Sequence, residues 1–238
     1  MTPELPFSFL GLFGDAVEFI FNEQEAQTGT VMVGGPEQVA ELAWEQLKVT
    51  AYALALSLVV ALPAGVLLGH YGKGEMLAIS IGNAGRAVPE LALIAFMAAA
   101  IGVGVLNLTI ALAVLGIPPI LTNSFVAIRQ VDRGAVDAAR GMGMTETELI
   151  RRVELPLGVP TIMGGVRTAT INIVATATIA PLAGVLTLGD FILSRNVYGD
   201  EGVLAGAICV ALMALALELL LAGVQRAMTS PGLRLREA

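Results

Sequence analysis

Few side chains in this sequence could do catalytic chemistry. The only cysteine, Cys209, lies in an apolar run, and the only histidine, His70, follows one, so we interpret His70 as an interfacial side chain rather than a metal ligand or a catalyst. Lys73 follows a glycine, but Leu67 and Gly74 stand where a phosphate-binding loop requires a glycine and a serine or threonine. The sequence therefore predicts no ATPase site, no catalytic residue, no cofactor and no metal.

Three ionisable side chains interrupt long apolar stretches. Arg86 and Glu90 are four residues apart and could pair if a helix continued through Pro89. Ionisable groups at membrane depth usually face protein or water, so these two residues are either a pair near the interface or part of a translocation path. Arg167 is expected to extend towards the membrane interface, with a place on the same path as the alternative.

The elements that position these residues are predicted to be membrane-spanning helices. Of the 238 residues, 56% are hydrophobic and 14% are charged, which is unlike a soluble domain. The apolar runs lack the alternation of barrel strands, so helices must satisfy the backbone in lipid. Pro89 should kink or restart the second span, and a proline pair at 118–119 should bend the third. The five predicted spans are residues 49–69, 76–103, 106–128, 160–185 and 203–224.

The first 48 residues differ from the rest because they carry eight acidic side chains and one basic side chain, Lys48. Residues 6–21 have a helical apolar spacing interrupted by two acids, which predicts an amphipathic helix on the membrane surface or, alternatively, a disordered acidic extension. Residues 22–35 are expected to be a linker, and residues 36–46 a short polar helix.

Residues 132–156 form the one long charged segment between spans. Asp132 is a good N-cap for a short helix that glycines at 141 and 143 would end. Thr145 and Glu148 have the spacing of a capping box, so a second helix should begin there and stop before Pro156. The segment is thus expected to form two short helices that meet at a glycine bend.

Charge distribution predicts the orientation. Five spans place the two termini on opposite sides, and nine of the 13 Lys and Arg residues then share one side with the charged segment. By the positive-inside rule that side is cytoplasmic, so the N-terminus is outside and the C-terminus inside. The predicted organisation is an extracytoplasmic segment 1–48, a transmembrane domain 49–226 with its loop at 129–159, and a cytoplasmic tail 227–238.

The charged segment resembles the cytoplasmic "EAA" coupling loop of ABC importer permeases. That motif reads Glu-Ala-Ala, three residues, Gly, nine residues, Ile, one residue and Leu-Pro. This chain reproduces every gap and differs conservatively at two motif positions, with Asp137 for Glu and Val153 for Ile. The matching residues are Asp137, Ala138, Ala139, Gly143, Val153, Leu155 and Pro156. The segments RAVPELALIAF, GGVRTATINIVATATIAPLAG and LGDFI are similar to the glycine betaine, carnitine and choline branch. At two positions, Glu90 and Thr187, the sequence departs from the residues usual in this branch, and these positions concern the pathway and the outer gate.

The resemblance implies an all-α membrane protein with the five-helix type I ABC importer permease fold and cytoplasmic coupling helices. It implies a permease for osmoprotectants such as glycine betaine, choline, carnitine and proline betaine in the cell membrane. The implied partners are ATP-binding cassette ATPase subunits, a second permease copy or paralogue, an extracytoplasmic substrate-binding protein and the lipid bilayer. A net charge of −7 argues against nucleic acid. The alternative function is an ion-coupled secondary transporter or channel, which would use Arg86, Glu90 and Arg167 to handle ions.

Overall fold

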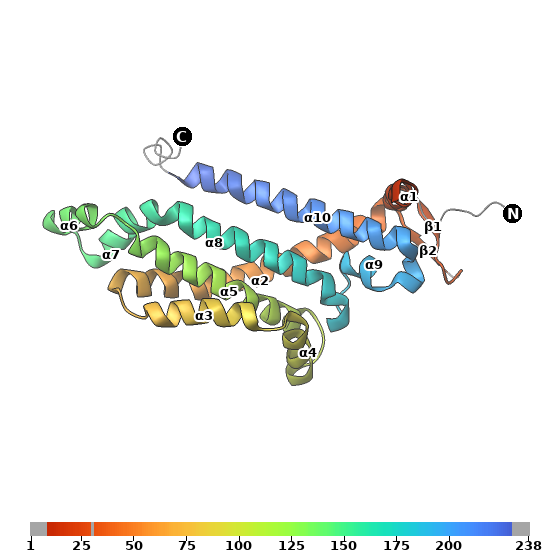
Figure 1. Ribbon diagram of the computed structural model, residues 1–238, viewed down its shortest axis with the longest axis horizontal. Helices are drawn as coiled ribbons and strands as arrows, with labels where there is room; N and C mark the ends of the chain where they lie inside the picture. Colours follow the sequence, from red (N-terminus) through yellow and green to blue (C-terminus); the bar gives the residue numbers. More distant parts are fainter. Residues whose placement is uncertain (1–8, 30, 230–238) are drawn as a thin grey trace.

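The computed structural model describes residues 9–29 and 31–229 of the chain, and it is an elongated bundle of helices (Figure 1). The long helices are α2 (Gly35–Tyr71), α5 (Val105–Arg129), α8 (Leu155–Thr176) and α10 (Arg195–Met228). Within the described residues, four helical stretches are long and apolar enough to cross a membrane: Gly35–Tyr71, Val105–Arg129, Glu146–Ala183 and Arg195–Met228. They correspond to the first, third, fourth and fifth predicted spans.

The second predicted span consists of two short helices, α3 (Glu75–Ala87) and α4 (Glu90–Ile101). Val88 between them is extended, with φ −76° and ψ 120°, as expected of a residue before proline. The helix therefore restarts at Pro89, as the sequence predicted, and α4 is inclined to the long axis of the bundle (Figure 1). Arg86 and Glu90 consequently belong to different helices, and the geometry for pairing along one helix does not form. The side chain of Arg86 lies outside the described part of the structure.

The core of the bundle is α5, which packs against α2 on one side and α8 on the other. Glycines allow these close approaches: a Cβ atom on Gly65 of α2 would lie 2.6 Å from the Leu121 carbonyl oxygen, and one on Gly165 of α8 would lie 2.7 Å from the Pro119 carbonyl oxygen. Ser57 Oγ of α2 also donates a 2.9 Å hydrogen bond to the Ala113 carbonyl oxygen of α5. Small residues on the first span therefore let the third span approach closely.

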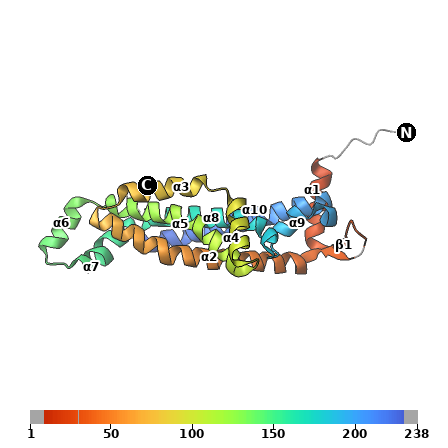
Figure 2. The ribbon, with the colours of Figure 1, turned by 90° about the horizontal axis from the view of Figure 1, so that it is seen from below.

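The N-terminal region is more ordered than the sequence predicted. Helix α1 (Phe9–Phe21) lies across the long axis of the bundle (Figure 2) and packs against α10. The expected linker contains an antiparallel hairpin of β1 (Glu23–Glu25) and β2 (Met32–Gly34). Phe19 of α1 is fully buried and meets Phe191 of α9 (Gly189–Leu193) edge to face, with ring centroids 5.1 Å apart. The alternative of a disordered extension is therefore wrong for the described residues of α1.

The predicted polar helix at 36–46 and the first span are one continuous helix, α2. No glycine or proline separates them, and Lys48 pairs with Glu45 one turn earlier at 2.6 Å, so the polar turn extends the helix without a break. Buried Gln46 donates a 3.1 Å hydrogen bond to the Val174 carbonyl oxygen of α8, which ties this junction to the bundle.

The two ends of the bundle carry different structures (Figure 2). One end holds α6 (Arg133–Gly141), α7 (Glu146–Leu149) and the π-helical turn η1 (Ile150–Glu154). The opposite end holds α1, the hairpin and α9, which follows the 3-10 segment η2 (Ala177–Ala183). The acidic N-terminal region and the charged segment are thus separated by the length of the bundle.

Candidate coupling loop and translocation cavity

The first half of the charged segment folds as its capping residues predicted. The Asp132 carboxylate accepts a 3.0 Å hydrogen bond from the Ala135 N–H, so α6 begins at the expected N-cap. The helix ends at Gly141, and Gly143 has a left-handed backbone with φ +85°. Glycine adopts this conformation at little cost. The Met144 N–H then donates to the Ala139 carbonyl oxygen at 3.2 Å, which closes the bend.

The second helix begins with the predicted capping box. Thr145 Oγ1 accepts from the Glu148 N–H at 3.3 Å, and Glu148 Oε2 accepts from the Thr145 N–H at 3.1 Å. These hydrogen bonds from Thr145 hold the pKa of Glu148 below its ordinary value, because they stabilise the charged carboxylate. The bend between α6 and α7 is therefore fixed at both of its ends.

The predicted end of this second helix before Pro156 is wrong. The chain continues from α7 through η1 directly into α8, and Pro156 lies in the first turn of α8. Proline has no N–H to donate, and its ring crowds the carbonyl group four residues earlier. The wide π turn lies immediately before the proline, where it accommodates this misfit without interrupting the helix. The α-helical hydrogen-bond pattern is therefore interrupted at η1, before Pro156, but the helix continues in the same direction.

The seven motif residues occupy this end of the bundle in two groups. Asp137 and Ala138 on α6 are exposed, whereas Ala139 is buried and 2% exposed. Gly143 at the bend is exposed, with open space around it. Val153 and Leu155 are half-buried at the junction of η1 and α8, and Pro156 is exposed. One group therefore presents a small, open surface, and the other connects it to a spanning helix.

His70 has a role in this region that the sequence did not predict. It is the penultimate residue of α2, its side chain is 1% exposed, and its Nδ1 atom lies 2.7 Å from Glu154 Oε2 of η1. Its Nε2 atom lies 3.0 Å from Glu146 Oε2 of α7. Since Glu146 and Glu154 are 76 and 84 positions away in the sequence, no local pattern could have found these contacts.

Arg140 extends this network to α6. Its Nη2 atom donates a 3.2 Å hydrogen bond to Glu146 Oε2. This hydrogen bond and the charge of the Arg140 guanidinium lower the pKa of Glu146 from its ordinary value. The side chain of Glu146 is 54% exposed, whereas that of Glu154 is only 6% exposed.

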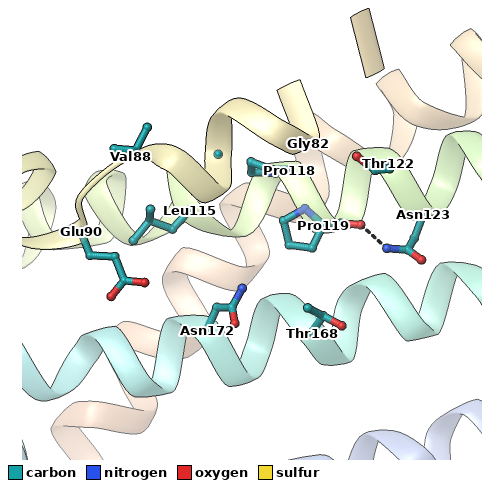
Figure 3. A pocket seen from close by; sticks show the side chains of 11 residues that line it. Gly82, Val88, Glu90, Leu115, Pro118, Pro119, Thr122, Asn123, Thr168 and Asn172 are labelled. Atoms are coloured by element: carbon teal, nitrogen blue, oxygen red, sulfur yellow. Dashed lines mark hydrogen bonds between the residues drawn. The ribbon is translucent and has the colours of Figure 1, made fainter. Parts of the chain in front are cut away.

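A cavity of about 400 Å³ lies between α5, α8 and the connection from α3 to α4 (Figure 3). Its volume falls within the usual range for small-ligand sites. Figure 3 shows Asn172 and Thr168 of α8 on one side and the proline pair of α5 on the other. The lining residues are Gly82, Gly85, Val88, Glu90, Leu115, Pro118, Pro119, Thr122, Asn123, Thr168 and Asn172. Of these, only Glu90 is ionisable.

Two of the three ionisable residues that were predicted for a path, Glu90 and Arg167, lie in different surroundings. Glu90 lines the cavity, and its Oε2 atom accepts a 2.8 Å hydrogen bond from Thr176 Oγ1. Arg167 lies on α8 but pairs with α10 instead, where its Nε atom donates to Glu218 Oε1 at 2.9 Å and its Nη1 atom donates to Gln225 Oε1 at 2.9 Å. Arg167 is not among the residues that line the cavity.

Comparison with known proteins identifies relatives over most of the chain. Residues 61–230 match the family described as "Binding-protein-dependent transport system inner membrane component". The choline transport system permease protein OpuBB of Bacillus subtilis (strain 168) is 37% identical over 196 residues, which cover 82% of this chain and 90% of the relative. The carnitine transport permease protein OpuCB of Listeria monocytogenes is 37% identical over 192 residues, with coverage of 80% and 88%.

Solved structures share the fold at lower sequence identity. The MetNI methionine ABC transporter, in an inward-facing conformation, contains a chain that superimposes with a TM-score of 0.69 at 22% identity. The superposition covers 80% of this chain and 96% of that one. An amino acid ABC transporter with histidines gives a TM-score of 0.59 at 19% identity, with coverage of 79% and 93%. The helical bundle is therefore the fold of type I ABC importer permeases.

Proposed function

Because the chain belongs to the family of inner membrane components of binding-protein-dependent transport systems, we propose that it imports quaternary ammonium osmoprotectants as a permease subunit. Glycine betaine, choline, carnitine and proline betaine are the proposed substrates. The observation that carries this proposal is the complete coupling-loop spacing, folded as two capped helices at one end of an apolar bundle. The named substrates of OpuBB and OpuCB point to the same compounds.

ATP hydrolysis is assigned to partner ATPase subunits that bind α6 and α7. The proposed contact surface is the exposed part of α6 with Asp137 and Ala138, together with Met142, whose side chain is 72% exposed. Methionine adapts its shape to an apolar cleft that changes form, so Met142 suits a partner that opens and closes. The loop can favour an inward or an outward state only if the ATPase conformations bind it with different affinities.

The cavity beside Glu90 is the proposed passage for substrate. A quaternary ammonium group cannot donate a strong hydrogen bond, so attraction to a carboxylate is one of the few means of recognising it. Glu90 supplies that charge, and Asn172 and Thr168 supply polar groups on the facing helix. The cavity lacks an aromatic lining among its described residues, so tight capture is assigned to an extracytoplasmic substrate-binding protein.

The proposed assembly contains two permeases, either two copies or this chain with a paralogue. One chain offers one coupling loop, whereas the proposed ATPase acts as a pair of subunits.

The proposed orientation places α6 and α7 in the cytoplasm, because Arg129, Arg133, Arg140, Arg151 and Arg152 lie at that end. The described part of residues 1–48 lies towards the other end, so this segment is proposed to be extracytoplasmic. Of the proposed cytoplasmic tail 227–238, residues 230–238 lie outside the described residues.

Reconstitution in lipid vesicles tests the proposal. Uptake of labelled choline and glycine betaine is measured with ATP and with the binding protein, the ATPase or the second permease omitted in turn. Uptake is expected only when all components and ATP are present. Saturable uptake by the purified chain alone, driven by an ion gradient without ATP, would instead establish the secondary transporter.

A further inference from the structure

The buried side chain of His70 makes two contacts that need more protons than its neutral ring can supply. A neutral imidazole has one N–H, and an ionised carboxylate only accepts hydrogen bonds. Yet Nδ1 lies 2.7 Å from Glu154 Oε2 and Nε2 lies 3.0 Å from Glu146 Oε2. Both contacts are hydrogen bonds only if the group of three side chains holds one additional proton, on the ring or on a carboxyl group. The two hydrogen bonds of His70 therefore both form when the additional proton is present, and one of them is lost when the proton is absent.

The surroundings of His70 are also strongly charged. A cavity of about 70 Å³ lies against its side chain. The ionisable groups that face this cluster from the packed elements are Glu154 of η1, Glu146 of α7, Arg133 and Arg140 of α6, Arg129 of α5 and Tyr71 of α2. The three arginines disfavour an additional positive charge, whereas the two glutamates favour it.

The position of His70 at the end of α2 gives these contacts a mechanical consequence. The coupling loop is joined covalently to α5 at its start and to α8 through η1, whereas His70 of α2 meets it through side chains. Arg140, Glu146 and Glu154 bring α6, α7 and η1 together at the His70 ring. The neighbouring Gly69 is pressed against α5, where a Cβ atom would lie 2.9 Å from the Phe125 carbonyl oxygen. A displacement of the loop that moves His70 therefore moves α2 together with α5, to which the loop is joined covalently.

We infer that His70 is a positioning residue that transmits movement of the coupling loop to α2, so that α2 and α5 move as a pair. Leu115, Pro118 and Pro119 of α5 form one wall of the cavity, so movement of this pair changes the shape of the proposed passage. Without the histidine, the loop still moves α5 and α8, to which it is joined covalently, but α2 no longer follows them. This inference rests on the proposed function, because it assumes that an ATPase moves the loop.

The test compares His70→Gln with the wild-type protein in the reconstituted complex. Glutamine is polar and similar in length, but both of its N–H donors are on one nitrogen, so it cannot replace two ring nitrogens that face different carboxylates. ATP hydrolysis and ATP-driven choline uptake are measured together from about pH 5 to about pH 8, the range in which histidine commonly changes charge. Uptake per ATP should fall about tenfold in the variant, the expected effect of losing a hydrogen bond to a charged group, while hydrolysis continues.

The pH profile separates positioning from general stability. Uptake per ATP by the wild-type protein should decrease as pH rises, because the additional proton is lost. The His70→Gln variant should show no such decrease. Arg152→Gln is the matched control, since Arg152 lies in η1 and makes only a 3.7 Å pair with Glu148 at a side chain that is 68% exposed. It should retain both the wild-type ratio and the wild-type profile.

Several outcomes would overturn the inference. One is a His70→Gln variant with the same uptake per ATP and pH profile as the wild-type protein. If that variant does not fold, Glu146→Gln removes one exposed partner of the ring, and an unchanged ratio and profile in this variant would be equally decisive. A wild-type complex that takes up no substrate with ATP refutes the proposed function itself, which distinguishes the two failures.

Discussion

Thr176 Oγ1 donates a 2.8 Å hydrogen bond to Glu90 Oε2, which joins the end of α8 to the first residue of α4. Thr176 is 1% exposed, whereas Glu90 is exposed and lines the cavity. One carboxylate oxygen is therefore anchored in the protein. The carboxyl group keeps further capacity to accept from, or attract, a solute in the cavity.

Replacing Glu90 tests the proposed passage. Glu90→Gln keeps the length of the side chain and a hydrogen-bond acceptor for Thr176 but removes the charge. The attraction between unit charges 4 Å apart is about 1 kcal/mol in water and about 4 kcal/mol near a protein surface, so uptake of choline should fall by about tenfold. ATP-driven uptake in vesicles measures the effect. Glu75→Gln, at an exposed acid in the first turn of α3, is the control and should leave uptake unchanged. If Glu90→Gln takes up choline as fast as Glu75→Gln, Glu90 is not part of the passage.

The bend between α6 and α7 depends on the left-handed conformation of Gly143. Gly143→Val should cost at least about 1–2 kcal/mol locally, because a β-branched residue is strained at φ +85°. The variant should enter the membrane normally but lose the ATPase in co-purification. Gly141→Ala is the control, since Gly141 lies in α6 and has equally open space around it. Full ATPase recovery with Gly143→Val would mean that the bend does not position the docking surface.

The close contact of α2 with α5 should not tolerate even one methyl group. Gly65→Ala would place Cβ 2.6 Å from a backbone oxygen, and such overpacking typically costs about 1–3 kcal/mol. We expect a lower melting temperature for the detergent-solubilised protein. Gly223→Ala on α10 has open space around the new methyl group and should melt at or above the wild-type temperature. Identical melting of the two variants would contradict the observed helix contact.

Arg167 and Glu218 are predicted to stabilise the α8–α10 contact as a pair. Their side chains are 31% and 25% exposed, so each is partly removed from solvent. Arg167→Gln or Glu218→Gln alone should lower the melting temperature, because the remaining charge loses its partner. The double variant should be more stable than either single variant. Arg195→Gln breaks an exposed pair with Asp200 and should have little effect. Additive losses in the double variant would show that the two residues act independently.

Orientation can be measured with single cysteines in a Cys209→Ser background. Gln27→Cys in the N-terminal hairpin should react with an impermeant thiol reagent added to intact cells. Met142→Cys in the coupling loop, at a side chain that is 72% exposed, should react only after permeabilisation. The reverse pattern would invert the proposed topology.

Local sequence patterns predicted the local structure of the coupling loop. Asp132, the Thr145 and Glu148 capping box and the left-handed Gly143 each depend on neighbours within four residues, and all three are confirmed. The restart at Pro89 is confirmed for the same reason, because proline acts on the residue before it and on the turn that it begins. These features needed no knowledge of the rest of the fold.

The features that sequence patterns missed depend on distant partners. Phe19 is buried only because α9 and α10 fold over it, and His70 has its role only because α7 and η1 return to the end of α2. Arg167 could not be assigned because its partner Glu218 is 51 positions later. The continuation of the helix through Pro156 required a π turn, for which the sequence offers no local marker.

The π turn at 150–154 also gives the spacing of the coupling motif an angular meaning. Each residue of an α-helix advances about 100° around the axis, and a π turn accommodates one residue more than an α turn. The nine residues between Gly143 and Val153 therefore set the rotation of the docking surface about the axis of α8, in addition to its distance from α8. Deleting one residue from this turn would leave the composition of the loop almost unchanged, yet it would rotate the surface by about a quarter of a circle away from its partner.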